Sequence, residues 1–189
     1  ALPDPLPAAF VDTVTAAGFL PHPTHERVRN IVASPWSAHA ADLAALVSEL
    51  DAGLCADPTL ARLPGRMLFV LDDGSGHLLG LPFDLGYQRV SDVEGRLLAA
   101  GGGTVPVSRD QAVGAVLERA RHFVRERETL DPAPWNVREL PAESQVLAGL
   151  SFGSVSSVAP PPAGRYGADV VATVPLGLLT PAMVAALAA

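Results

Sequence analysis

The sequence of 189 residues contains no lysine, and its 13 basic residues are all arginine. Acidic residues outnumber them, so the formal net charge is −7 at pH 7. A general nucleic-acid-binding protein needs a basic face to neutralise phosphates. We therefore predict no nucleic-acid partner. Any anion has to be bound locally by a few converging arginines, which suits a polycarboxylate or a small oxyanion in a cleft.

Cysteine is almost absent as well. Cys55 is the single cysteine, so this chain alone cannot form an internal disulfide, a zinc knuckle or a thiolate-bound iron–sulfur cluster. We expect Cys55 to be a small buried residue in a helix. The histidines show no spacing typical of metal ligands, and we predict no metal site. No charged leader precedes an apolar stretch, which favours a cytoplasmic protein, and we expect the chain to be a piece of a longer one.

Apolar residues are plentiful, at 49% of the chain, and their periodicity predicts one substantial α+β unit. Helical spacing predicts helices over residues 7–17 and 38–54, and a capping box at 108–111 predicts a third helix over 109–128. Apolar runs bounded by glycine, proline or aspartate predict the strands, the run at 66–71 being the central one and the next ones an antiparallel meander. The predicted strands are 28–32, 66–71, 87–90, 96–99, 104–107 and 135–140.

The composition changes after residue 141. Small and polar residues and three consecutive prolines predict a linker over 142–164. Beyond it, a strand at 168–174 and a helix from Thr180 predict the start of another domain. The last twenty residues carry no charge and are long enough to span a bilayer, but prolines interrupt them and no basic residues flank them. We therefore predict no membrane contact.

Two short motifs have ordinary explanations. Asp72 and Asp73 precede a glycine, and since the other ligands of a calcium loop are missing, we interpret them as a hairpin turn. Residues 149–153 match G-x-S-x-G, but that nucleophile motif needs a following helix. The next residues predict a linker instead.

The most distinctive stretch is Arg27 to Pro35, in which two arginines and Asn30 precede an apolar strand that ends at a proline. Donor-rich side chains at the start of a buried strand are typical of an anion site. Solvated arginines before an ordinary strand explain the spacing equally well.

The order of motifs resembles the nitrite and sulfite reductase superfamily, and in particular its precorrin-3B synthase branch. The resemblance rests on V-R-N-I-x-x-S-P at 28–35 and on L-P-x-R at 63–66, which leads into the predicted central strand. It implies the end of a ferredoxin-like half-domain at 1–22, a reductase-like α+β half-domain at 23–141 and the start of a second ferredoxin-like half at 165–189. The implied fold is a mixed, largely antiparallel sheet with covering helices.

The resemblance also implies a function. Arg29 and Arg66 match basic residues that line the substrate cavity of the family, and Asn30 lies beside them; it indicates no catalytic residue. The full protein would be an oxygen-dependent oxidoreductase of cobalamin biosynthesis that hydroxylates the tetrapyrrole precorrin-3A. It would use a four-iron four-sulfur cluster, and a further iron or sirohaem, held by the remainder of the chain with its second repeat. The chain as given would be one wall of that cavity.

Two alternatives remain open. The first is a fragment of a sirohaem-dependent nitrite or sulfite reductase, although Leu68 stands where such reductases carry a second lysine. The second is a non-catalytic anion-binding or assembly module, since a single cysteine suits that interpretation equally well.

Overall fold

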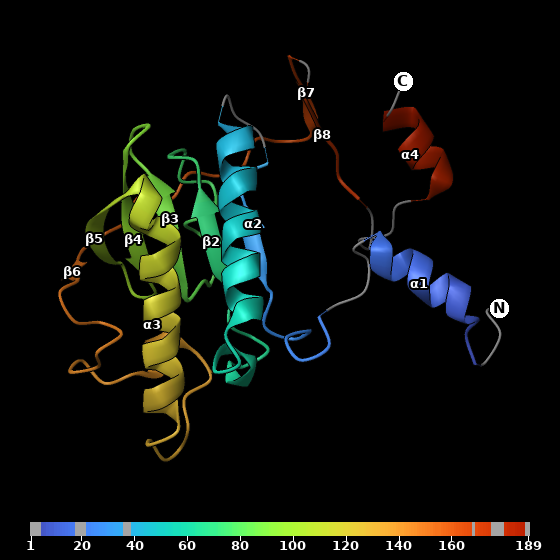
Figure 1. Cartoon of the computed structure of the whole chain (residues 1–189). Helices are drawn as coiled ribbons and strands as arrows, with labels where there is room; N and C mark the ends of the chain where they lie inside the picture. Colours follow the sequence, from blue (N-terminus) through green and yellow to red (C-terminus); the bar gives the residue numbers. More distant parts are fainter. Residues whose placement is uncertain (1–4, 18–21, 36–38, 168, 175–179, 188–189) are drawn as a thin grey trace.

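A computed structural model describes residues 5–17, 22–35, 39–167, 169–174 and 180–187 (Figure 1). Its main unit is α+β and contains one six-stranded mixed sheet whose strands lie in chain order. The pairs β1–β2 and β2–β3 are parallel, and the three pairs from β3 to β6 are antiparallel. The predicted class, the mixed sheet and the meander are therefore confirmed. The strands are β1 (Ile31–Ala33), β2 (Phe69–Asp72), β3 (Leu85–Arg89), β4 (Glu94–Ala99), β5 (Gly103–Ser108) and β6 (Ser151–Phe152).

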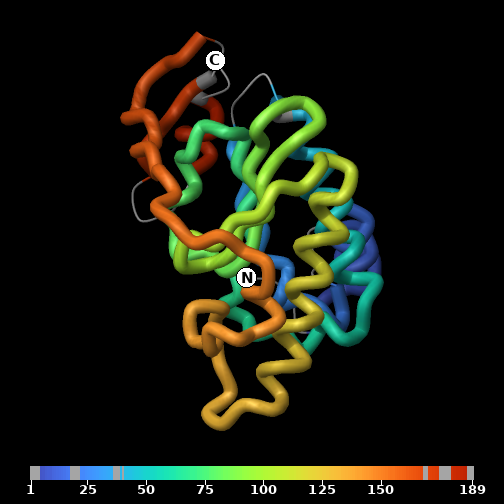
Figure 2. Tube along the Cα trace, turned by 90° about the vertical axis from the view of Figure 1, so that its left-hand side faces the viewer, coloured from blue at the N-terminus to red at the C-terminus, as the bar shows by residue number. Residues whose placement is uncertain are grey.

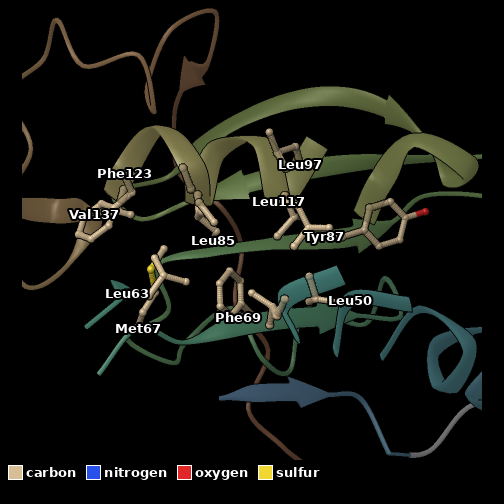
Figure 3. Close-up of a cluster of buried hydrophobic side chains, with 14 of the residues drawn as sticks. Leu50, Leu63, Met67, Phe69, Leu85, Tyr87, Leu97, Leu117, Phe123 and Val137 are labelled. Atoms are coloured by element: carbon tan, nitrogen blue, oxygen red, sulfur yellow. The ribbon is translucent and has the colours of Figure 1, made fainter. Parts of the chain in front are cut away.

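Helices α2 (Ala40–Ala56) and α3 (Ala112–Arg127) cover one face of the sheet (Figure 1). Alternation along each strand directs every second side chain to that face, where Phe69, Leu85 and Leu97 belong to one buried cluster with Leu50 and Leu117 from the helices (Figure 3). Burying a side chain of this size contributes about 1.5–3 kcal/mol. The helix-covered face is therefore the main source of stability.

The opposite face is closed by loops. A small cluster of Val70, Phe83 and Leu98 lies there, and residues 153–158, which we call the strap, pass over this side of the strands (Figure 2). The strap is held at both ends: Gly153 N–H donates to the carbonyl of Gly102 at 3.2 Å, and Val158 N–H donates to the carbonyl of Gly76 at 3.1 Å. This side of the sheet is thus covered without a helix.

The predicted strand at 135–140 is wrong, because the segment contains the 3₁₀ helix η3 (Val137–Glu139). The Asn136 side chain accepts the Arg138 N–H at 3.1 Å, and the Val137 N–H donates to Asp84 at 2.8 Å. These hydrogen bonds to side chains take the place of the backbone hydrogen bonds that a β-strand would form with a neighbouring strand.

The hairpin assigned to Asp72 and Asp73 is also wrong, since the strands on either side of that turn, β2 and β3, are parallel. Residues 73–84 cross to the strap side instead. The box at 108–111 does begin a helical stretch, but Ser108 makes no side-chain cap to the 3₁₀ turn η2 (Arg109–Gln111) that precedes α3. Another short turn, η1 (Leu60–Arg62), follows α2.

The terminal segments lie outside the sheet and its two covering helices (Figure 1). Helix α1 (Ala8–Ala16) buries no residue. Strands β7 (Gly164–Tyr166) and β8 (Asp169–Val171) form a hairpin, of which only the second strand was predicted, and α4 (Pro181–Leu187) follows. Gly18, at which we expect the helix predicted over 7–17 to stop, and residues 175–179, where we expect a turn between the last predicted strand and helix, fall outside the described residues. Across the described ranges, no helix has the length and apolar character needed to cross a bilayer.

Candidate functional site

Asn30 connects the start of β1 to the turn before β2. Its side-chain amide donates to the carbonyls of Gly65 at 3.0 Å and Met67 at 3.2 Å, and also to that of Arg27 at 3.2 Å. Since Gly65 and Met67 flank Arg66, these bonds bring Asn30 beside the backbone of Arg66. Asn30 therefore fixes the turn that carries Arg66.

The Arg29 side chain forms an ion pair within the fold. Its guanidinium contacts Asp51 of α2 through two bonds, Nε–Oδ1 at 2.5 Å and Nη2–Oδ2 at 2.7 Å. The hydrogen bond to Asp51 raises the pKa of Arg29 further above its usual value. A bidentate pair of this kind fixes both side chains, and Arg29 does not line the depression that contains Arg66.

Arg66 is exposed and forms no ion pair with any residue in the described ranges. It lines a surface depression of about 390 Å³ together with Trp135, Asn136 and Glu139. The Glu139 carboxylate accepts a hydrogen bond from the backbone N–H of Trp135 at 2.7 Å and another from the side-chain amide of Asn136. That carboxylate is thus used within its own turn, which leaves the Arg66 guanidinium available to a ligand.

Trp135 gives the same depression a flat apolar surface. The side chain is 56% exposed, and the guanidinium carbon of Arg127 lies 5.7 Å from its ring centroid. Arg127 also donates to the Pro134 carbonyl at 2.9 Å. A contact between a guanidinium and an indole steadies the ring. An indole beside an unpaired arginine suits a flat, carboxylate-bearing ligand.

The buried carboxylate of Asp84 stabilises the turn that lines this depression. Asp84 was not predicted from the sequence. The carboxylate is buried and accepts the N–H groups of Val137 at 2.8 Å and Leu68 at 2.9 Å. Burial raises the pKa of Asp84, and the two backbone bonds oppose that shift. Asp84 thus holds the turn of Trp135 against the start of β2. Its sequence signal was a lone acid directly before an apolar strand.

A larger cavity of about 680 Å³ lies on the strap side of the sheet. It was also missed, although the repeated glycines and serines of its loops were a signal. Glycines and polar residues dominate its lining; they come from the loop at 73–76, from β3, from Gly102 and Thr104, and from the strap, and Arg96 of β4 contributes a guanidinium. A smaller cavity of about 270 Å³ next to it shares Gly102, Gly153 and Val155 and adds Arg138.

The residues present do not fit an iron–sulfur cluster. Four thiolates are the usual ligands, whereas the chain has only Cys55, and the described part of it contains no group of three or more potential metal-binding side chains. Cys55 lies in α2 and is half-buried rather than fully buried, and desolvation raises the pKa of its thiol. We assign no redox step to these residues.

The G-x-S-x-G segment lacks the context of a nucleophile. Ser151 is exposed in β6, and no helix follows it before residue 164.

No family model, curated protein or solved structure is significantly similar to this chain. The resemblance to the nitrite and sulfite reductase superfamily thus remains a prediction from the two motifs.

Proposed function

We propose that this chain supplies one wall of a tetrapyrrole site in an oxidoreductase of the precorrin-3B synthase type. The observation that supports the proposal best is the depression at Arg66, in which an unpaired guanidinium lies beside an exposed indole. A tetrapyrrole is a flat conjugated ring with carboxylates at its edge. Its ring would pack on Trp135, and a carboxylate would bind Arg66.

The roles of the three predicted residues differ in this proposal. Arg66 binds the ligand directly. Asn30 positions the turn of Arg66 through its bonds to Gly65 and Met67. Arg29 was our main candidate from the sequence, but a ligand carboxylate would have to displace Asp51 to reach it. Because that pair is bidentate and partly buried, Arg66 carries the binding and Arg29 stabilises the surrounding fold.

Binding of uroporphyrin, a porphyrin with carboxylates around its edge, tests the site in this chain. We expect binding to quench tryptophan fluorescence. Trp135→Ala should weaken binding about 10-fold because stacking is lost, and Arg66→Gln should weaken it about 3- to 10-fold.

Arg125→Gln is the matched control, since Arg125 is exposed on α3 and forms no ion pair with the described residues. It removes the same charge at a different place and should leave the affinity unchanged. Equal losses for Arg66→Gln and Arg125→Gln would argue for a general charge effect and against this site.

The reaction itself is tested in a full parent protein. Oxygen-dependent conversion of precorrin-3A would support the proposal, whereas turnover of nitrite or sulfite with bound sirohaem would favour a reductase. If the chain binds porphyrin but the parent protein has neither activity, the non-catalytic anion-binding module is the better description. Leu68, in place of a second lysine, is the feature that favours the monooxygenase over the reductases.

A further inference from the structure

We propose that the 680 Å³ cavity under the strap is a second and separate ligand site, which binds a small molecule with one oxyanion on a hydroxylated carbon skeleton. Its volume is in the range of small-molecule sites. It shares no lining residue with the depression at Arg66 and Trp135, so it is independent of the tetrapyrrole proposal.

The floor of the cavity is held in place by a buried carboxylate. Asp72 is fully buried at the end of β2. Its two oxygens accept the N–H groups of Gly74 at 2.9 Å, Gly76 at 3.0 Å and Leu78 at 3.3 Å, and the side-chain amide of Gln88 at 3.1 Å. Four donors on one carboxylate fix the loop that follows β2. The floor is therefore preorganised before any ligand binds.

Glycines allow the strap to lie directly on this floor. Gly76 has a φ of +80°, and a Cβ there would meet the Ser156 carbonyl oxygen at 2.9 Å. Gly102 has a φ of +85°, and a Cβ there would collide with the carbonyl oxygen of Gly153. Only glycine combines a positive φ with so close an approach. The fold thus keeps two backbone segments in contact around a space that it leaves unfilled.

The strap contributes backbone and hydroxyl donors to the lining of that space. Between the two ends of the strap, the N–H groups of Ser154, Val155 and Ser156 donate to none of the residues in the described ranges, and neither do the hydroxyls of the two serines. All three residues line the cavity. Backbone N–H groups and hydroxyls are donors that an oxyanion can accept from.

Arg96 supplies the charge. In the ladder it pairs with Gln88, whose amide bonds to Asp72, so Arg96 projects to the strap side of the sheet. It is exposed and has no ion pair among the described residues. The other arginine in the lining, Arg89, is mostly buried and paired with Asp92. Arg96 is thus the cation available to a ligand in this cavity.

One acidic residue in the lining restricts which ligands can bind. Asp73 lies in the loop after β2, and its Oδ1 accepts the Ser75 N–H at 3.0 Å. A second anionic group on the ligand would be repelled by this carboxylate, whereas hydroxyl groups can donate to it. The lining therefore favours a single phosphate or carboxylate on a polyhydroxylated skeleton over a polyanion.

Isothermal titration of the 189-residue chain with ribose 5-phosphate and with gluconate tests this site and distinguishes phosphate from carboxylate. We expect at least one of them to bind with a Kd of roughly 1 mM or lower, and we expect neutral ribose not to bind. Arg96→Gln should weaken binding at least about 10-fold. Arg125→Gln removes the same charge outside the cavity and should bind as the unaltered chain does.

A double variant, Ser154→Ala with Ser156→Ala, tests the strap itself. It should weaken binding about 3-fold or more through the loss of two hydroxyl donors, with an unchanged melting temperature because both side chains are exposed. Absence of binding by both acids, or equal affinities of the Arg96 and Arg125 variants, would overturn the proposal. Arg66→Gln should leave this binding intact, so the two sites can fail separately.

Discussion

The two faces of the sheet are covered by different kinds of structure: two long helices on one, and a strap without regular structure on the other. Under the helices, large side chains such as Phe69 and Leu97 are almost completely buried in one continuous cluster. On the strap side only a small apolar cluster is buried, and glycines, polar residues and an exposed arginine line a cavity. Close packing excludes ligands, whereas an unfilled polar space admits them. Stability and binding are therefore separated between the faces.

The largest expected difference is in the cost of removing an apolar side chain from either face. Phe69→Ala deletes a fully buried ring under the helices, and we expect the free energy of unfolding to fall by about 3–5 kcal/mol. Val158→Ala truncates a side chain of the strap that is about half exposed, with an expected loss below about 0.5 kcal/mol. Urea unfolding of both variants measures the contrast. Similar losses would show that the strap side carries as much of the core as the helix side.

A smaller effect is expected where the strap rests on the sheet. Gly101 and Gly102 are neighbours with nearly the same φ, +84° and +85°. A Cβ on Gly101 has open space, but one on Gly102 would meet the Gly153 carbonyl. Both alanine variants lose about 1–2 kcal/mol from the positive φ, and Gly102→Ala should lose about 1 kcal/mol more because the strap must move.

The same pair also tests the cavity. Gly102→Ala should weaken binding of the small oxyanion, whereas Gly101→Ala should not. Identical behaviour of the two variants in unfolding and in titration would mean that the strap does not depend on its contact with Gly102.

Most of the helix-covered face could be predicted from the sequence. The helix over 40–56 and the buried strand β2 follow from apolar periodicity, because burial under one continuous core imposes that period. The prediction that this strand is central was wrong, since β2 is the second of the six strands. The segment at 135–140 shows where the method fails. Its residue pattern is typical of a strand, but its backbone N–H groups donate hydrogen bonds to the side chains of Asp84 and Asn136. A carboxylate 53 residues away in the chain leaves no periodic signal.

The candidate sites were less predictable for the same reason. Arg66 was predicted from the L-P-x-R motif that precedes β2, but its neighbour Trp135 comes from a distant segment that was interpreted as a strand. Asp51, the ion-pair partner of Arg29, lies in α2, and the spacing of residues in the sequence could not show that the two side chains meet. The strap-side cavity has only short glycine and serine motifs as signals, because its shape depends on two long-range backbone contacts.

Polar contacts under the helices should contribute less than the apolar ones. Asp57, at the end of α2, accepts a hydrogen bond from Arg121 of α3 at 2.6 Å, and this bond lowers the pKa of Asp57. The stabilisation is therefore complete above the unfolded pKa of about 3.9 and is lost as the pH falls through the lower folded value. Asp57→Asn retains an oxygen that can accept the Thr59 N–H and should cost about 0.5–1 kcal/mol at neutral pH.

Urea unfolding of the chain and of Asp57→Asn at several pH values measures this pair. The difference between the two proteins should shrink steadily below about pH 4. A difference that does not depend on pH would assign the loss to packing rather than to the charge of Asp57.

The smallest expected change has the opposite sign and lies in the middle of the helix-covered face. Tyr87 is fully buried in β3, and its hydroxyl has no hydrogen-bond partner among the residues that the structure describes. Burial raises the pKa of Tyr87, so the group stays neutral. Removing an unsatisfied buried hydroxyl is neutral or stabilising, and Tyr87→Phe should therefore raise the free energy of unfolding by about 0–1 kcal/mol. Tyr166→Phe is the control, because that exposed hydroxyl donates to the Pro162 carbonyl at 2.8 Å and its removal should cost at most about 0.5 kcal/mol. A clear loss of stability for Tyr87→Phe would mean that the hydroxyl is satisfied, and the helix-covered face would then contain a polar site of its own.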